Sequence, residues 1–209
     1  ITILGDQYRF NPKWGQKGFP AELMPIPYYD CFDFEDGYIY DYNSSCRKDV
    51  IIPEVINGVA VIGIENYAFS GYELTSVSIP NTITYMGVGT FNDNNFPDAK
   101  AFIYDRNSDG SINNKVLASY GGLKKTNVAI PEGIETINMY AFAGINLNGS
   151  ITLPSSLKEI NMGAFIANQI EEIIFPEISN LEYIGDNSFM YSSISYLTIP
   201  NTVTYIGSG

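Results

Sequence analysis

The eight residues that begin at Asp105 come nearest in this chain to a metal-binding pattern. They read Asp-Arg-Asn-Ser-Asp-Gly-Ser-Ile, which matches the first eight positions of a calcium loop, with oxygen ligands at Asp105, Asn107 and Asp109. The twelfth position of such a loop supplies a bidentate carboxylate, but here it is Val116. A hairpin turn rich in Asp, Asn and Gly therefore explains the segment better, with calcium binding as the alternative. We expect no metal and no other cofactor.

Catalytic groups are scarce. The 209 residues contain no histidine, which removes imidazole catalysis and most zinc sites. The adjacent carboxylates Glu171 and Glu172 could serve a glycosidase in principle, but nothing in the sequence places them in a cleft, and a solvated face explains them better. No glycine-rich phosphate loop follows a strand and opens a helix. We expect a protein that is not an enzyme.

Charge and hydropathy limit the partners. There are 23 acidic residues against 11 basic ones, a net charge of −12, which argues against binding to nucleic acid or to anionic lipid surfaces. No apolar run approaches the length of a membrane span, so no membrane insertion is expected in these residues. Apolar residues make up 45% of the chain, which is enough for a folded core.

The two cysteines, Cys31 and Cys46, bracket a segment that reads as a hairpin. The turn would bring its two ends together, so a disulfide is the favoured interpretation, and closing this loop would stabilise the fold by ~3 kcal/mol in the chain-entropy model. Two unrelated buried thiols are the alternative.

Internal repeats dominate the rest of the chain. An apolar residue followed by proline recurs, mostly at spacings of 22 to 27 residues with one of 51, at Pro53, Pro80, Pro131, Pro154, Pro176 and Pro200. A phenylalanine follows each of the first five, at Phe69, Phe91, Phe142, Phe165 and Phe189. Between proline and phenylalanine lies a second apolar pair, such as Leu157 and Ile160. Registered columns of this kind indicate one structural unit per repeat.

Each unit has a readable local structure. Before the proline, segments such as Leu74 to Ile79 alternate apolar and small polar residues, which predicts a strand with one buried face. We expect the same of residues 149–153, 170–175 and 194–199. Proline ends the strand because it cannot donate to a ladder, and turn residues follow it. The phenylalanine would fill the coil interior, and because one unit cannot bury its own apolar side, neighbouring units must stack.

The pattern L-x-x-V-x-I-P-x-x-I-x-x-[IM]-G-x-x-x-F, clearest at residues 74–91, resembles the leucine-rich repeats of the BspA-like bacterial surface protein family. Residues 49–63, which read D-V-I-I-P-E-V-I-N-G-V-A-V-I-G, are similar to that family's usual first repeat. The resemblance implies a leucine-rich-repeat solenoid, a β-rich right-handed superhelix of ~23-residue coils with short turns or 3-10 segments in place of long helices. It also implies an extracellular or cell-surface location and a role in adhesion or recognition, with no catalytic residues.

The expected organisation has two parts. Residues 1–30 are a non-repetitive N-terminal arm or cap, and residues 31–209 are the repeat domain. Within the domain we expect a starting hairpin at 31–48 with Asp36 and Gly37 in its turn, an insertion at 92–129, and a truncated last repeat at 199–209 that lacks its continuation. The strands of the insertion are expected at Ala101 to Asp105 and Val116 to Tyr120.

Aligning the prolines places two columns of residues outward on the expected concave sheet. One column contains Asp49, Ser76, Asn127, Ser150, Glu172 and Tyr196, and the other contains Ile51, Ser78, Ala129, Thr152, Ile174 and Thr198. Most are small and uncharged, so a partner could approach closely, although an inert ladder of residues that suit a β surface is an equal alternative. We take Tyr196, Glu172, Ser150, Asn127 and Ser76 as the candidate ligand-binding residues.

These features favour a non-enzymatic cell-surface or secreted recognition or adhesion module. Its partner would be a protein or glycan of a host or neighbouring cell, bound through the solenoid surface. The alternatives are a structural spacer that displays another domain and an accessory module of a glycan-degrading enzyme.

Overall fold

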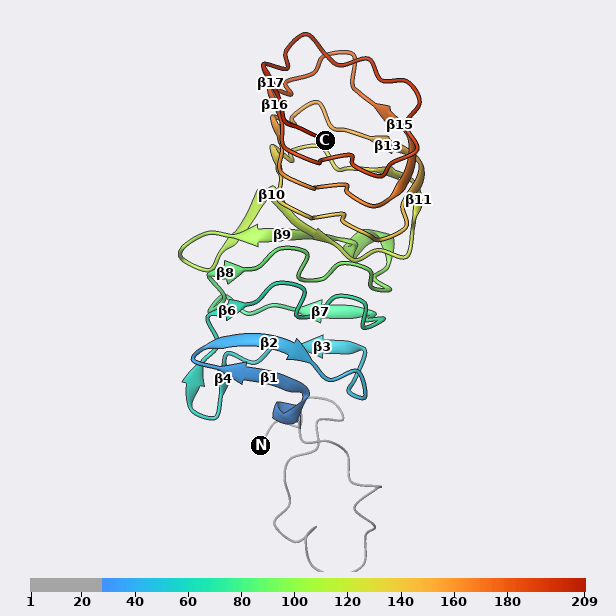
Figure 1. The fold of residues 1–209 in the computed structure, drawn as a ribbon. Coiled ribbons are helices and arrows are strands. Elements are labelled where there is room, and N and C mark those ends of the chain that lie inside the picture. The colour runs from blue at the N-terminus through green and yellow to red at the C-terminus, as the bar shows by residue number, and fades with distance from the viewer. Residues whose placement is uncertain (1–27) are drawn as a thin grey trace, which may run out of the picture.

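The computed structural model describes residues 28–209. The chain winds into a solenoid in which each coil lies on the one before it, so the repeat architecture expected from the sequence is confirmed (Figure 1). Helix is confined to two 3-10 turns among these residues, η2 (Tyr28–Cys31) and η3 (Asp98–Lys100). The arm expected at residues 1–30 lies outside the described residues, except for the start of η2.

One side of the solenoid carries the strands that precede the prolines. They are β3 (Asp49–Ile51), β7 (Ser76–Ser78), β11 (Thr126–Ala129), β13 (Asn148–Thr152) and β15 (Gln169–Ile174). They pair in parallel as two separate sheets, β3–β7 and β11–β13–β15 (Figure 1). Because β11 already belongs to the second sheet, the last four residues of the range 92–129 are part of a regular coil, and the insertion itself ends before them.

The other side of the solenoid is a second set of parallel ladders, with one short strand per coil. Each of its two sheets begins with an antiparallel hairpin. Its strands are β1 (Phe32–Glu35), β2 (Tyr38–Tyr42), β6 (Gly63–Ile64), β8 (Tyr85–Met86), β9 (Phe102–Arg106), β10 (Ile112–Tyr120), β12 (Thr136–Ile137), β14 (Glu159–Ile160), β16 (Tyr183–Ile184) and β17 (Tyr205–Ile206). They form the sheets β1-β2-β6-β8 and β17-β16-β14-β12-β10-β9. A small antiparallel pair, β4 (Val55–Ile56) and β5 (Val59–Ala60), extends from the first coils.

Aromatic rings fill the interior. Phe142 and Phe165 are fully buried, and their ring centroids lie 4.8 Å apart in a stacked arrangement. The stack continues to Phe189 on one side and to Tyr120 on the other. Tyr120 comes from β10, so the insertion supplies its own ring at the position where the repeat would have a phenylalanine.

The insertion is an antiparallel hairpin of β9 and β10 that takes the place of a coil (Figure 1). β10 pairs in parallel with β12, the short strand of the next coil. β9 has the expected length but lies one residue later than predicted, whereas β10 begins four residues earlier than predicted and ends where expected. On the opposite side, the Arg106 guanidinium donates to the carbonyl of Ile79 at 3.3 Å, where the sheet β3–β7 ends. The hairpin thus continues the ladder toward the C-terminal coils, and the sheets on both sides of the solenoid are interrupted where it begins.

Two tyrosines lie in a backbone conformation that is unusual for their type. Tyr67 and Tyr140 have φ values of 58° and 57°. In each case the ring lies against a glycine of the following coil. A Cβ added at Gly89 or Gly163 would come within 2.6 Å of the ring, so only glycine fits there. A large residue and a glycine therefore alternate between successive regular coils at this position.

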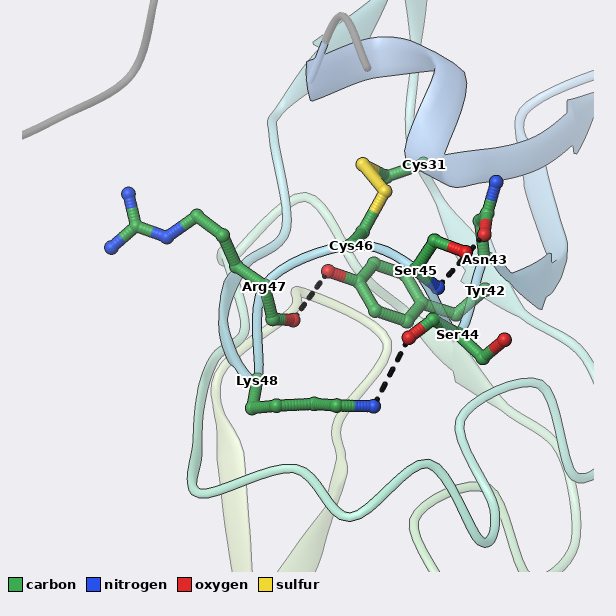
Figure 2. The surroundings of a disulfide bond; sticks show 8 residues. All are labelled: Cys31, Tyr42, Asn43, Ser44, Ser45, Cys46, Arg47 and Lys48. Atoms are coloured by element: carbon green, nitrogen blue, oxygen red, sulfur yellow. Dashed lines mark hydrogen bonds between the residues drawn. A yellow bond between two sulfur atoms is a disulfide. The ribbon is translucent and has the colours of Figure 1, made fainter. Parts of the chain in front are cut away.

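The first hairpin and its disulfide close the N-terminal end of the described stack. The Asp36–Gly37 turn joins β1 to β2, as the sequence indicated. Cys31 and Cys46 are bonded, with their Cα atoms 5.9 Å apart (Figure 2). Next to them the buried Tyr42 hydroxyl donates to the carbonyl of Arg47 at 2.7 Å, and burial raises the pKa of Tyr42 to about 12.

One predicted strand is wrong: residues 194–199 form no strand against β15. The Ser193 amide still donates to the Ile170 carbonyl at 2.8 Å, but no backbone hydrogen bond joins residues 194–199 to β15 in the described chain. This coil takes eight residues from Pro176 to Ile184, where its neighbour takes six from Pro154 to Ile160. The coil with two extra residues is the one after which the chain fails to pair with β15.

The ring stack leads to a stability prediction. Phe142→Ala or Phe165→Ala removes a fully buried ring and leaves a cavity between coils that cannot collapse, so each should lower the free energy of unfolding by about 3–5 kcal/mol. Chemical denaturation would measure it, with Leu123→Ala at an exposed position as control. Costs near zero for both phenylalanines would contradict the packing.

The disulfide gives a second prediction. Its 15-residue separation should make the Cys31→Ser/Cys46→Ser double variant about 3 kcal/mol less stable than the oxidised protein. Mass spectrometry of unreduced peptides should show the linked pair, and complete alkylation of both thiols without reductant would contradict it.

Candidate functional site

The exposed side of the pre-proline strands is the first candidate surface, which we call the strand face. The strand pairing brings the predicted columns together: Asp49 lies opposite Ser76, Ser150 opposite Glu172, and Ala129, Thr152 and Ile174 occupy matching positions on three strands. Buried Val128, Ile151 and Ile173 point the other way. Alternation along each strand therefore orients the small polar residues outward.

Asn127 and Ser150 are joined rather than free. The Asn127 Oδ1 accepts hydrogen bonds from the Ser150 amide at 2.9 Å and from its hydroxyl at 3.2 Å. Asn127 has φ +52°, and the same Oδ1 lies 2.4 Å from where a Cβ of Gly149 would be. Only glycine at position 149 permits this close approach, because a Cβ there would clash with the oxygen. The side-chain oxygen of Asn127 is therefore already engaged within the face.

Ser76 is separated from the other candidates. It lies on β7 beside Asp49 on β3, and the insertion divides this sheet from β11–β13–β15. The Arg47 guanidinium donates to Asp49 at 2.9 Å, and this hydrogen bond lowers the pKa of the Asp49 carboxyl. The strand face is thus two patches, one at Asp49 and Ser76 and one from Asn127 to Glu172.

Glu172 and Tyr196 meet at a hollow beside β15. The hollow has a volume of about 610 Å³, and its lining includes Glu172, Phe175, Glu177, Ile178, Tyr196 and Thr198. We call it the β15 hollow. It occupies the place where residues 194–199 fail to pair with β15. Tyr196 is 81% exposed, with its hydroxyl 3.2 Å from that of Thr198.

The repeats match a known family. The model for the BspA-type leucine-rich repeat region matches residues 40–123 and 110–209, with six copies. This chain belongs to that family. Repeats of the BspA type are typically displayed on surfaces and mediate binding, and their fold is generally a non-catalytic scaffold.

Two solved structures are similar to this BspA-type chain. One is a leucine-rich cell surface protein from Faecalibacterium prausnitzii, with 22% identity and a TM-score of 0.39, covering 78% of this chain and 52% of that protein. The other is the leucine-rich repeat protein of T. pallidum, with 13% identity and a TM-score of 0.33, covering 91% of this chain and 98% of that protein. The chain spans about half the length of the first. No curated protein matches it.

The calcium candidate lies in the turn between β9 and β10. Asp109 accepts from the amide of Ser111 at 2.9 Å and from its hydroxyl, and the hydroxyl bond is the main cause of a lowered pKa for Asp109. The Asp105 carboxylate accepts from Asn138 at 2.8 Å and from the Arg106 amide, and Asn107 donates to Ser111. The carboxylate oxygens of Asp105 and Asp109 thus already accept hydrogen bonds from the protein. No group of three or more potential ligands among His, Cys, Asp and Glu occurs within residues 28–209.

Of the residues that line the β15 hollow, sequence reasoning placed only Glu172, Tyr196 and Thr198 on the outward face. Glu177 and Ile178 lie in its lining, and Ile178 is 77% exposed, which is unusual for a large apolar side chain. Both lie in the coil that is two residues longer than its neighbour. The irregular spacing after Pro176 was the available signal.

Within residues 28–209, no helix has the length and apolar character needed to cross a membrane.

Metal dependence can be tested directly. Calcium bound at about a hundred times its dissociation constant would add ~2.7 kcal/mol of stability. Because Asp105 accepts a hydrogen bond from Asn138 of the next coil and Asp109 accepts from Ser111 of the turn, we expect thermal melting in millimolar calcium and in chelator to coincide. A calcium-dependent rise in melting temperature that disappears in Asp109→Ala would contradict this.

Proposed function

We propose that this BspA-type chain is a non-enzymatic recognition module, displayed at the cell surface or secreted, that binds a protein or a glycan. The contact surface is the part of the strand face from Asn127 through Ser150 to Glu172, together with Tyr196 across the β15 hollow. Ser76 belongs to the other patch and contributes only to a ligand long enough to pass the insertion.

One observation carries the proposal. Polar side chains of small or moderate size lie on three adjacent strands, where Ser150 is paired with Glu172 and hydrogen-bonded to Asn127. The row ends at a hollow whose edge holds an almost fully exposed tyrosine. A flat polar surface that ends at an exposed aromatic ring suits binding, because tyrosine provides a large rigid contact at small entropic cost. The family's typical role in binding supports the same conclusion.

The non-enzymatic part of the proposal has its own support. The sequence has no histidine to act as a base, and the Ser150 hydroxyl donates to the Asn127 amide oxygen rather than to a basic group. Glu172 has no second carboxylate opposite it on the neighbouring strand, where Ser150 lies. Around Ser150 the face is therefore suited to contact, because no basic group is placed to activate the hydroxyl.

The test is a comparison of two tyrosine variants. Tyr196→Ala should abolish capture on a glycan array or in pull-downs from host-cell surface extracts, because it removes the largest exposed contact beside β15. Tyr191→Ala is the matched control, since Tyr191 is 72% exposed but does not line the hollow. Equal capture by Tyr196→Ala and wild type would contradict the assignment, and no capture by the wild type would favour a spacer.

A further inference from the structure

The outer edge of β15 is open although chain runs beside it. Each preceding strand of this sheet is joined to the next just before its proline: the Ile130 amide donates to Thr152 at 2.9 Å, and the Leu153 amide donates to Ile174 at 3.0 Å. The corresponding bond, from Phe175 to Thr198, does not form in the described chain. Open backbone groups at a sheet edge are a template for another strand.

The β15 hollow provides room for such a strand. Its volume of about 610 Å³ lies within the range of ~300–1,000 Å³ that is typical of ligand sites. It is bounded by β15 on one side and by Tyr196 and Thr198 on the other. An extended segment inserted here would complete the ladder that residues 194–199 leave incomplete.

The charged and apolar side chains that line the β15 hollow indicate which kind of peptide could bind there. The described lining includes the carboxylates of Glu172 and Glu177 and contains no lysine or arginine. Two large exposed apolar side chains, those of Ile178 and Tyr196, also lie in the lining, together with Ile173 of β15 and Phe175, the residue after the strand. Carboxylates attract basic side chains, and an aromatic ring beside them favours a cation over its face.

We propose that the β15 hollow binds an extended peptide segment in which basic and apolar residues alternate, and that this segment pairs with β15 as an added strand. The proposal rests on the proposed function and names the partner class of the same site. The peptide backbone accepts from the Phe175 amide, its basic side chains reach Glu172 and Glu177, and its apolar side chains, on the opposite face of the strand, pack on Ile173 and Phe175. Alternation follows from the two faces of a strand.

The probe is a fluorescein-labelled octapeptide of alternating valine and lysine, titrated onto the intact chain at low ionic strength and followed by fluorescence anisotropy. We expect saturable binding that weakens as salt is raised. An octapeptide of alternating valine and glutamate should not bind. The lysine peptide with an N-methyl group on every amide should also fail, because it has no N–H donor for a ladder on either edge.

Variants separate the hollow from general acidity. The Glu172→Gln/Glu177→Gln pair should weaken binding of the lysine peptide by about tenfold or more, since it removes both carboxylates without changing shape. Glu159→Gln, on β14 in the opposite ladder, should leave binding within about twofold. Circular dichroism and melting curves confirm that each variant is folded.

The outcomes distinguish this inference from the broader function. Equal binding by the N-methylated peptide, or no effect of the Glu172→Gln/Glu177→Gln pair, would overturn strand pairing in the hollow. Absence of peptide binding while Tyr196→Ala still abolishes capture of a glycan or protein would overturn the peptide as partner and leave the proposed recognition function standing.

Discussion

Each coil of this solenoid contributes one aromatic ring to a shared interior and depends on the next coil to cover it. Ring centroids along the regular parts of the stack are 4.8 to 5.4 Å apart. This spacing is close to that of paired strands, so ring packing and strand pairing can be satisfied by one coil pitch. The insertion obeys the same constraint, because Tyr120 on β10 stacks on Phe142 as a phenylalanine of a regular coil would. The position of every surface strand follows from this pitch.

Buried asparagines supply the polar counterpart to the rings. Asn168 lies three residues after Phe165, accepts from the Leu147 amide at 2.9 Å, and donates to the carbonyls of Phe142 and Phe165. Asn94 repeats the arrangement with Leu74. Such side chains satisfy backbone groups of the turn that would otherwise be buried without partners. These asparagines therefore tie the turn of one coil to the backbone of the coil before it.

The sequence was sufficient for the fold because the same columns recur in every unit. Phe142, the proline-terminated strands and the register that places Ser150 opposite Glu172 all follow from local alternation repeated at a fixed interval. The unpaired edge of β15 could not be predicted in this way. The coil beside it has two extra residues after Pro176, but the first coil has a longer segment after Pro53 and still pairs β3 with β7, so coil length alone does not reveal an open edge. The structural role of Asn168 was equally hidden, because its partners lie on another coil.

The alternation of large residue and glycine has a consequence for how such a chain can be rearranged. Tyr67 lies over Gly89 and Tyr140 over Gly163, and Asn187 lies against Gly209 in the same manner. Removing the single coil that holds Gly163 would set Tyr140 against Asn187. Two large side chains would then meet at a position where each now packs against a glycine. Removing two neighbouring coils would restore the match. The natural module of duplication, deletion or grafting in this solenoid is therefore a pair of coils, and chimaeras spliced in even numbers of repeats should assemble where odd ones clash.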